Sequence, residues 1–217
     1  MSKILTQRVK CNQCDNEDDF PVHHSVNVSL DPDLKERVFK KDLFNFSCDT
    51  CGCNAIILHD FLYHDMKNKF IIQYLTKGQL TPEMTPGLAL FAEQGYKIRV
   101  VGNLNDLIEK ILIFDQGLKD TAIEVLKATI MAKEDEKDKP VTSVYFAAKS
   151  KNDNGEEGLY FVATREKDEP KYLTFLMKDI KTHLESAPEE LAKWPDPKSM
   201  IVNFKTMFPE DSEKKGE

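Results

Sequence analysis

The sequence predicts an α+β fold, made of an antiparallel sheet module, an αα-hairpin and a smaller C-terminal α+β part. Residues 20–75 contain short segments in which apolar and polar residues alternate, as in half-buried strands. Apolar residues recur at helical spacing between residues 104 and 130. Residues 141–164 contain two strand-like runs around an Asn154-Gly155 turn signal. Strands grouped apart from helices are typical of the α+β class.

Length and charge narrow the choice of function. The 217 residues suffice for one domain or two small ones, because domains cluster at roughly 100–150 residues. Charged residues make up 31% of the chain and the formal net charge is -7. An acidic balance argues against a general nucleic-acid binder, since phosphate contacts need clustered Lys and Arg. The longest Lys runs are the pairs Lys40-Lys41 and Lys214-Lys215.

The sequence shows no targeting or membrane segment. The start, MSKILTQRVK, lacks the apolar stretch of about 7–15 residues that a signal peptide needs. The longest apolar runs, residues 55–58 and 111–114, fall far short of the roughly 18 residues that span a bilayer. We therefore expect a cytoplasmic protein without membrane association. In a reducing compartment, paired CxxC motifs bind metal or do redox work more often than they form disulfides.

The first strands are interrupted by a short helix. Residues 24–30 alternate apolar and polar side chains and predict a half-buried strand. Asp31-Pro32-Asp33 combines a helix cap, a proline and an acid of the first turn, so a helix to about residue 41 is expected. Further strands are expected at residues 44–48, 55–63 and 70–75, the last two joined by a polar turn near residues 65–68. Residues 76–87, with two Pro and two Gly, predict a connecting loop.

Helices are expected after a strand at residues 97–101. The first is predicted by apolar residues at helical spacing, namely Leu104, Leu107, Ile108, Ile111 and Leu112. Gly117 is a suitable stop, and Asp120 is a suitable cap for a second helix. That helix carries Ile123, Leu126 and Ile130 on one face. The two helices predict an αα-hairpin, which is more typical of a core scaffold than of a chemical site.

A charged segment at residues 133–139, followed by Pro140, marks the expected domain boundary. The expected parts are a module over residues 1–132, a C-terminal α+β region over residues 141–208 and a disordered tail over residues 209–217. Residues 141–148 and 159–164 should form a hairpin within the second part. Helical pieces are expected next, ending before Pro195 and resuming after Pro197.

Four cysteines carry the clearest chemical signal. Cys11 and Cys14 form one CxxC pair, and after 33 intervening residues Cys48 and Cys51 form another. Each pair can make a tight turn whose two thiolates grip one side of an ion. Two such turns complete the tetrahedron that Zn²⁺ accepts without penalty. The pattern therefore predicts a four-cysteine zinc site, so that the sheet module bears a zinc ribbon.

The residue after the second cysteine of each pair often needs a left-handed backbone. Gly52 adopts this conformation at no steric cost, and Asp15 or Asn16 tolerates it. Four thiolates leave no open coordination position, whereas catalytic zinc keeps one, so the site is expected to be structural.

Other interpretations of the cysteines stay open. A thioredoxin-like redox motif is normally a single CxxC at a helix start, and here there are two. The same four sulfurs can also hold iron, which the sequence does not distinguish from zinc. Cys53 is a fifth thiol, expected to be a bystander beside the second pair, with ligand exchange or oxidation sensitivity as the alternative.

The segment HDFLYHD, residues 59–65, is a second candidate site. On one strand His59 and His64 would lie on opposite faces, and Asp60 and His64 would be about 13 Å apart. A turn cap or an edge histidine is therefore the expected role. Structural or solvent-exposed roles are also expected for His23, His24 and His183. The sequence contains no evident nucleophile-and-base arrangement, glycine-rich phosphate loop or GxSxG motif.

In order and spacing these motifs resemble the bacterial and archaeal CpXC proteins. The resemblance rests on the two CxxC pairs, SVNVSLDPDLKERVFKKDLFNFSC (residues 25–48) and YHDM (residues 63–66). Residues 99–127 are similar to the helical segment that often follows, so roughly the first 130 residues are covered. The resemblance implies a zinc-ribbon-like site on Cys11, Cys14, Cys48 and Cys51. Asn12 and Asp49 replace the proline of the family's name, which should relax each turn without removing a ligand.

Three functions follow as hypotheses. The leading one is a zinc-binding protein whose structural site supports a protein-interaction or scaffold module, because an acidic protein with a closed metal site fits binding better than chemistry. The second is an enzyme of unknown reaction with a site near Tyr63, His64 and Asp65. The third is nucleic-acid binding through a basic face formed by Arg37, Lys40, Lys41, Lys67 and Lys69, for which a solvated surface is the expected alternative.

Overall fold

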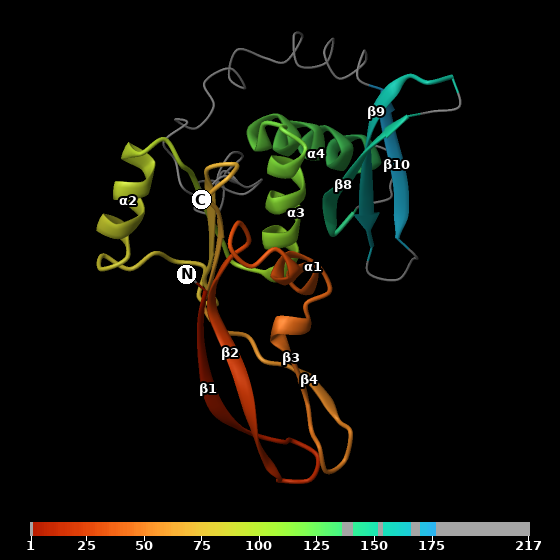
Figure 1. Cartoon of the computed structure of the whole chain (residues 1–217). Helices are drawn as coiled ribbons and strands as arrows, with labels where there is room; N and C mark the ends of the chain where they lie inside the picture. Colours follow the sequence, from red (N-terminus) through yellow and green to blue (C-terminus); the bar gives the residue numbers. More distant parts are fainter. Residues whose placement is uncertain (1, 136–140, 152–153, 166–169, 177–217) are drawn as a thin grey trace, which may run out of the picture. The chain divides into compact units, whose positions relative to one another are not determined.

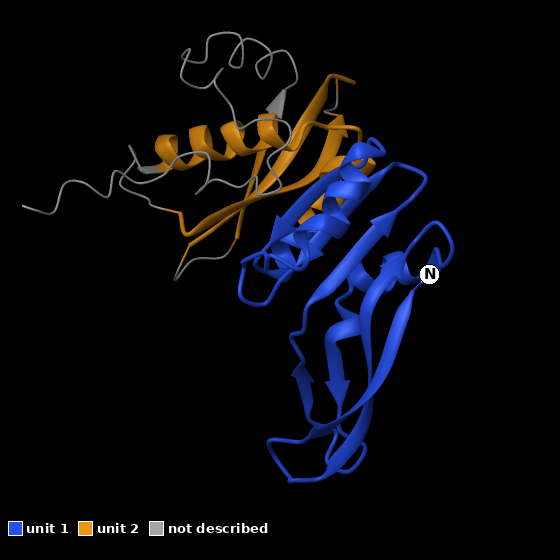
Figure 2. Ribbon diagram, turned by 90° about the vertical axis from the view of Figure 1, so that its left-hand side faces the viewer, with its two compact units in different colours: residues 1–108 blue, residues 109–217 orange. Residues whose placement is uncertain are grey.

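The computed structural model describes residues 2–135, 141–151, 154–165 and 170–176. These residues form four α-helices and ten strands, which confirms the predicted α+β class. The chain divides into two compact units, residues 1–108 and residues 109–217 (Figure 2). The first unit contains a five-stranded and a two-stranded sheet, and the second contains a three-stranded sheet.

Strands dominate the first unit (Figure 1). In chain order its elements are β1 (Lys3–Lys10), β2 (Glu17–Asn27), α1 (Asp33–Phe39), a 3-10 turn (Asp42–Phe44), β3 (Asn45–Ser47), β4 (Asn54–Ile56), β5 (Phe61–Asp65), β6 (Phe70–Tyr74), α2 (Thr85–Glu93) and β7 (Lys97–Val101). Helix α3 (Leu104–Asp115) begins in the first unit, near its C-terminal limit at residue 108, and continues into the second. The elements that follow are α4 (Asp120–Asp135), β8 (Ser143–Lys151), β9 (Glu157–Thr164) and β10 (Lys171–Leu176).

The five-stranded sheet is mixed, with the order β1-β2-β5-β6-β7. The pair β5–β6 is antiparallel, as predicted. The pair β1–β2 is also antiparallel, although no strand was predicted at residues 3–10. The pairs β2–β5 and β6–β7 are parallel. Parallel neighbours need a crossover connection, and α2 supplies one between β6 and β7. Strand β6, which lies between β5 and β7, is buried along its whole length, so both of its faces are covered.

The strand predicted at residues 55–63 is wrong, because the chain forms two strands there, β4 and β5. Polar contacts hold the intervening residues out of both strands. The ring nitrogens of His59 lie 3.0 Å from the carbonyl oxygens of Ile57 and His23. Asp60 accepts hydrogen bonds of 2.8 Å from the backbone N–H and the hydroxyl of Thr76. A run of apolar residues does not reveal such contacts.

Two other boundaries in the first unit differ from the prediction. The strand predicted at residues 24–30 begins at Glu17 and ends at Asn27. The carbonyl oxygen of Asn27 accepts hydrogen bonds from the backbone N–H groups of Leu30 and Asp31, which turns the chain toward α1. The loop predicted at residues 76–87 gives way to α2 at Thr85, where proline occupies the first turn.

The predicted αα-hairpin is confirmed in α3 and α4. The connection passes through Gly117, whose φ of +66° favours glycine. The predicted hairpin of the C-terminal part is confirmed as β8 and β9, which pair antiparallel. Residues 171–176, where helical pieces were expected, form β10 and pair antiparallel with β9.

Some predictions lie outside the described residues, including the end of the charged boundary at residues 136–140, the helical pieces around Pro195 and the tail at residues 209–217. The domain limits at residues 132 and 141 stay predictions. None of the helices in the described part of the chain has both the length and the apolar character to cross a bilayer.

Candidate metal centre

The sulfurs of Cys11, Cys14, Cys48 and Cys51 lie within 4.8 Å of one another. The Sγ atoms of Cys11 and Cys51 are 3.7 Å apart, and those of Cys14 and Cys48 are 3.6 Å apart. A disulfide needs an S–S distance of about 2.05 Å, so these are free thiols. The structure therefore brings together, from two distant segments, the four cysteines that the spacing singled out.

The spacing of the sulfurs fits a four-coordinate metal ion. Metal–sulfur bonds of about 2.3 Å in a tetrahedron place the sulfurs about 3.8 Å apart. The Cys11–Cys51 and Cys14–Cys48 distances, 3.7 and 3.6 Å, are close to this value. Cys11 and Cys48 are each only 2% exposed, whereas Cys14 and Cys51 are exposed. The cluster is therefore embedded on one side and open to solvent on the other.

Each cysteine pair lies in a tight loop closed by backbone hydrogen bonds. In the first loop the N–H of Cys11 donates to the carbonyl oxygen of Asn16 at 2.7 Å, and Asp15 has a φ of +57°. In the second, the N–H of Cys48 donates to the carbonyl oxygen of Cys53 at 2.9 Å, and Gly52 has a φ of +69°. The left-handed residues predicted after each second cysteine are confirmed.

Two hairpins carry these loops. The first loop joins β1 to β2 and the second joins β3 to β4, and both lie at the same end of their hairpins (Figure 1). We call the two hairpins with their loops the metal lobe. Its core is small and consists of Cys11, Phe20, Val22, Phe46 and Cys48, with partly buried Val9, Cys53, Ala55 and Ile57 against it. The rings of Phe20 and Phe46 meet edge to face at 6.1 Å and connect the hairpins.

Asp18, which belongs to none of the predicted sites, also connects the two loops. Its Oδ1 accepts a hydrogen bond of 2.7 Å from the side-chain amide of Asn16 in the first loop. Its Oδ2 accepts one of 3.1 Å from the backbone N–H of Asp49 in the second. An acid inside a strand is unusual, so the Glu17-Asp18-Asp19 run was an available signal.

The sulfurs differ in their affinity for protons. The pKa of Cys11 is lowered to about 6, because the backbone amides of Gln13 and Cys14 donate hydrogen bonds to its sulfur. For Cys14 the amide of Asn16 lowers the pKa, but the thiol of Cys51 and the other nearby thiols raise it to about 12. Four negative sulfurs at these distances repel one another, so a cation is needed for all of them to be thiolates together.

Cys53 lies beside the cluster but outside the group of four. Its sulfur is half-buried, 3.6 Å from Oδ1 of Asn12 and 3.8 Å from the carbonyl oxygen of Asn54. Burial raises its pKa, so Cys53 is held as a neutral thiol. These contacts agree with the expected bystander role.

Tyr63, His64 and Asp65 do not converge on a common site. Tyr63 is fully buried and stacks on Phe70 at 5.8 Å. Asp65 accepts hydrogen bonds from the backbone N–H of Asn68 at 2.9 Å and from its side-chain amide at 2.8 Å, so it caps the turn between β5 and β6. His64 lies on the other face of β5 from these two residues.

The histidines are structural in their contacts. The ring of His64 packs against those of Phe91 and Tyr96 at 5.4 and 5.3 Å. Burial lowers the pKa of His64, and burial also lowers that of His23, so both favour the neutral form. His59 bridges two carbonyl groups next to β5. His183 lies outside the described residues.

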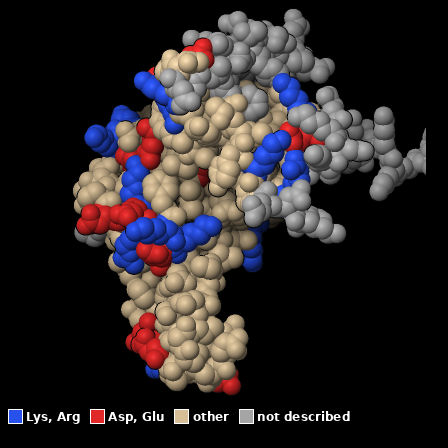
Figure 3. Space-filling view, turned by 90° about the vertical axis from the view of Figure 1, so that its right-hand side faces the viewer, with Lys and Arg blue, Asp and Glu red and all other residues tan. Residues whose placement is uncertain are grey.

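The basic residues considered for a nucleic-acid face lie on or next to α1 and in the turn before β6, away from the cysteine loops. Two of them have polar partners: Lys40 pairs with Glu36 at 2.7 Å, and Lys41 donates to Asn105 at 2.9 Å. In Figure 3 the metal lobe, the lower projection, has few charged side chains on the face shown, and Lys and Arg elsewhere are mixed with Asp and Glu.

Comparison with known proteins finds one similarity. A family model described as "CpXC protein" matches residues 9–127, which is more than half of the 217-residue chain. The match includes both cysteine pairs and ends within α4. The searches of curated proteins and of solved structures found no match.

Proposed function

Because this chain belongs to the CpXC family, whose matched region includes all four clustered cysteines, we propose that it binds one Zn²⁺ in a structural site. The ligands are Cys11, Cys14, Cys48 and Cys51. The metal holds the two loops of the metal lobe together, and the lobe is part of a protein-interaction or scaffold module. The observation that carries the proposal is the clustering of the four sulfurs within 4.8 Å, with two pairs at 3.7 and 3.6 Å.

Zinc is the metal that this donor set favours. Thiolates are soft ligands, and Zn²⁺ takes a tetrahedral arrangement without a preference of its own. The four sulfurs fill every position, so no water or substrate has a place on the ion. Iron is the alternative that the same ligands accept. A reducing compartment such as the cytoplasm would keep the thiols ready for either ion.

The metal would supply folding energy that the lobe lacks. Only five residues form the buried cluster of the lobe, and two of them are the cysteines Cys11 and Cys48. A core of this size gives little hydrophobic stabilisation. Metal binding is then coupled to folding, because the four ligands come together only in the folded lobe. This role needs no reaction at the metal.

The binding role is favoured over the two alternatives by the positions of the side chains. An enzyme site near Tyr63 would need His64 and Asp65 to face a common cleft, and they lie on opposite faces of β5. Nucleic-acid binding through the ribbon would need a basic patch near the cysteine loops. Of the residues considered for it, Arg37 lies on α1, and Lys40 and Lys41 follow that helix. The cations next to the first loop, Arg8 and Lys10, are each paired with an acid of the same hairpin. We therefore propose that the partner is a protein, rather than a nucleic acid or a membrane.

The proposal is tested by metal analysis of protein purified under reducing conditions, for zinc and iron together. We expect about one zinc per chain in the wild type. Cys48→Ser should lose the metal and unfold at a lower temperature, while the matched variant Cys53→Ser should keep it. Metal-free wild-type protein that is folded, with titratable thiols, would contradict the proposal.

A further inference from the structure

Strand β1 is exposed to an unusual degree. It lies at the edge of the five-stranded sheet, and in the described part of the chain it pairs only with β2 (Figure 1). Of its eight residues, seven are exposed, and only Val9 is partly buried. Ile4 and Leu5, on opposite faces, are 50% and 47% exposed. An eight-residue strand with both faces exposed to solvent gains little stability from burial. Its outer edge can pair with a further strand.

The backbone N–H and C=O groups of β1 are oriented to pair with a further strand. Thr6 lies opposite Pro21 of β2. Proline has no N–H, so this pair cannot exchange two hydrogen bonds and belongs to the non-hydrogen-bonded kind. The N–H and C=O groups of Thr6 therefore point away from β2, toward the outer edge. By the alternation of an antiparallel ladder, the same holds for Ile4 and Arg8.

The charge of β1 indicates which neighbour it accepts. Its sequence, KILTQRVK, contains three cations and no acid, in a chain of net charge -7. On its paired side these cations meet the acidic start of β2, with Arg8 opposite Asp19 and Lys10 opposite Glu17. Arg8 pairs with Glu17 at 3.7 Å, and both side chains are more than half exposed, at 68% and 55%. Lys10 pairs with Asp15 at 2.8 Å, also on an exposed surface. Exposed pairs of this kind are weak, so Arg8 and Lys10 remain able to bind further acids.

A second copy of the chain does not fit this edge. Antiparallel pairing of two β1 strands would bring together two segments that each contain three cations and no acid, so no cation would gain an acidic partner. Charged edge strands are a common protection against such self-association. The same cations that reject a copy of β1 favour an acidic strand.

We propose that the outer edge of β1 binds an extended, acidic segment of a partner protein as a sixth, antiparallel strand of the sheet. Acidic residues at the start of the segment lie beside Arg8 and Lys10, and apolar residues that follow lie beside Ile4 and Leu5. The order of charge and apolar residues is that of β2, the neighbour that β1 already has. The inference rests on the proposed role as a protein-interaction module and names its binding edge.

The test uses the full-length, zinc-loaded protein and a synthetic peptide. The peptide copies residues 17–27 with Pro21→Thr, so that no proline takes the place of an N–H that faces β1. A control peptide has its three acids replaced by Lys. Binding is measured by fluorescence anisotropy, and the amides that respond are located by NMR. We expect saturable binding of the acidic peptide, shifts in the β1 amides and no binding of the control.

The decisive variant is Thr6→Pro. It removes an outward N–H without touching the β1–β2 ladder, and proline is tolerated on an edge strand when its nitrogen faces outward. We expect peptide affinity to fall about tenfold while zinc content stays unchanged. Affinity unaffected by Thr6→Pro, or no binding to wild-type protein that holds its zinc, would overturn the inference. Wild-type protein without zinc would instead contradict the metal proposal.

Discussion

At the scale of the residue, Asp18 shows how the two cysteine loops are held in register. Between the cysteines of the two loops there are only weak thiol–thiol contacts of 3.6 and 3.7 Å when no metal is bound. The carboxylate of Asp18 accepts hydrogen bonds from Asn16 of the first loop and Asp49 of the second. Groups that orient a metal's ligands in this way influence affinity although they do not touch the ion.

We predict that Asp18→Ala weakens zinc binding about tenfold, because removal of an outer-shell partner typically has an effect of 10–100-fold. Affinity is measured by competition with a colorimetric chelator. Asp19→Ala is the matched control, since Asp19 is the next residue of β2 and is exposed on the opposite face. Equal affinities for the two variants would show that the bridge has no role in metal binding.

Gly52 isolates the effect of backbone conformation. Its φ is +69°, and a Cβ added there would meet no atom within 4 Å. Gly52→Ala should lower the free energy of unfolding by about 1 kcal/mol, through the left-handed conformation alone. In α2, Gly87 also has open space around it but no positive φ, so Gly87→Ala should be neutral or stabilising. Denaturant unfolding of both zinc-loaded variants measures the difference, and equal destabilisation would refute the conformational argument.

His64 gives a prediction for pH. Burial lowers its pKa below the ordinary value of 6.5. The unfolded chain takes up the proton at that ordinary value, so stability falls as the pH drops through about 6.5. An NMR titration should therefore place the midpoint of His64 below 6.5. His64→Phe should reduce the loss of thermal stability between about pH 7.5 and 5.5, and a midpoint at or above the ordinary value would contradict the account.

The four members of the cysteine cluster could be predicted from sequence, because the geometry of each CxxC turn depends only on residues within the turn. Spacing alone indicated that Cys11 and Cys48 would meet, and that Asp15 and Gly52 would be left-handed. The bridging role of Asp18 could not be predicted, since it depends on where β2 lies relative to the second loop. The packing of His64 on aromatic rings likewise depends on α2, which the sequence did not indicate.

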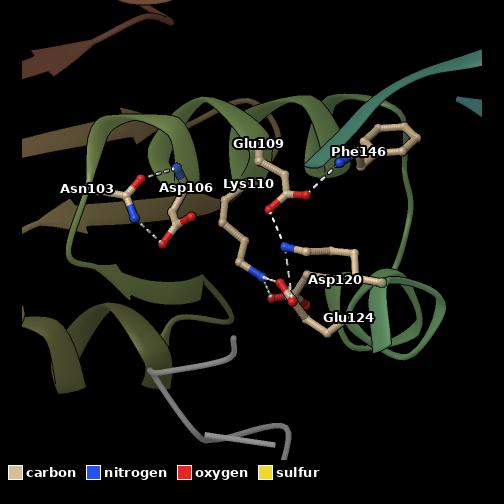
Figure 4. Close-up of polar contacts among 8 residues, drawn as sticks. Asn103, Asp106, Glu109, Lys110, Asp120, Glu124 and Phe146 are labelled. Carbon is tan, nitrogen blue, oxygen red and sulfur yellow. Dashed lines mark hydrogen bonds and ion pairs between the residues drawn. The ribbon is translucent and has the colours of Figure 1, made fainter. Parts of the chain in front are cut away.

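At the scale of the element, buried charges connect the two helices of the αα-hairpin. Lys110 of α3 is 1% exposed and lies 2.8 Å from Glu124 and 3.4 Å from Asp120 of α4 (Figure 4). Lys127 of α4 reaches back to Glu109 of α3 at 2.8 Å. Burial raises the pKa of Glu109 to about 7, in keeping with three carboxylates that share two ammonium groups.

We predict that Lys110→Met is strongly destabilising, by about 3–5 kcal/mol, because it removes one of the two ammonium groups that three buried carboxylates share and leaves the cluster with excess negative charge. Urea unfolding followed by circular dichroism measures the effect. Lys40→Met is the control, since Lys40 forms an equally short pair with Glu36 at 2.7 Å but on an exposed surface. That variant should change stability little. Similar losses in the two variants would show that burial does not matter here.

The success of prediction differed among elements for physical reasons. The strand at residues 97–101 and the helices α3 and α4 follow local periodicity, so the sequence indicated them well. The break between β4 and β5 depends on contacts of His59 with distant carbonyls, which no local pattern encodes. The pairing of β10 with β9 is similarly non-local. A buried Lys110 could not be expected, because lysine is almost always exposed.

At the scale of the whole molecule, the chain consists of two units with different means of stabilisation. The first unit combines a buried sheet centre with a metal lobe of very small core, and the second holds its helices together with buried ion pairs. Metal removal should therefore act first on the metal lobe. The family match over residues 9–127 includes both cysteine loops, together with β2, β3 and β4 of the lobe, and begins near the end of β1.

The most direct test of the central claim is X-ray absorption spectroscopy at the zinc edge on the purified, metal-loaded protein. The account predicts a first shell of four sulfurs at about 2.3 Å, with no nitrogen or oxygen. That result would establish a closed site on Cys11, Cys14, Cys48 and Cys51. A first shell with fewer than four sulfurs, or with nitrogen or oxygen in place of one, would contradict a purely structural centre.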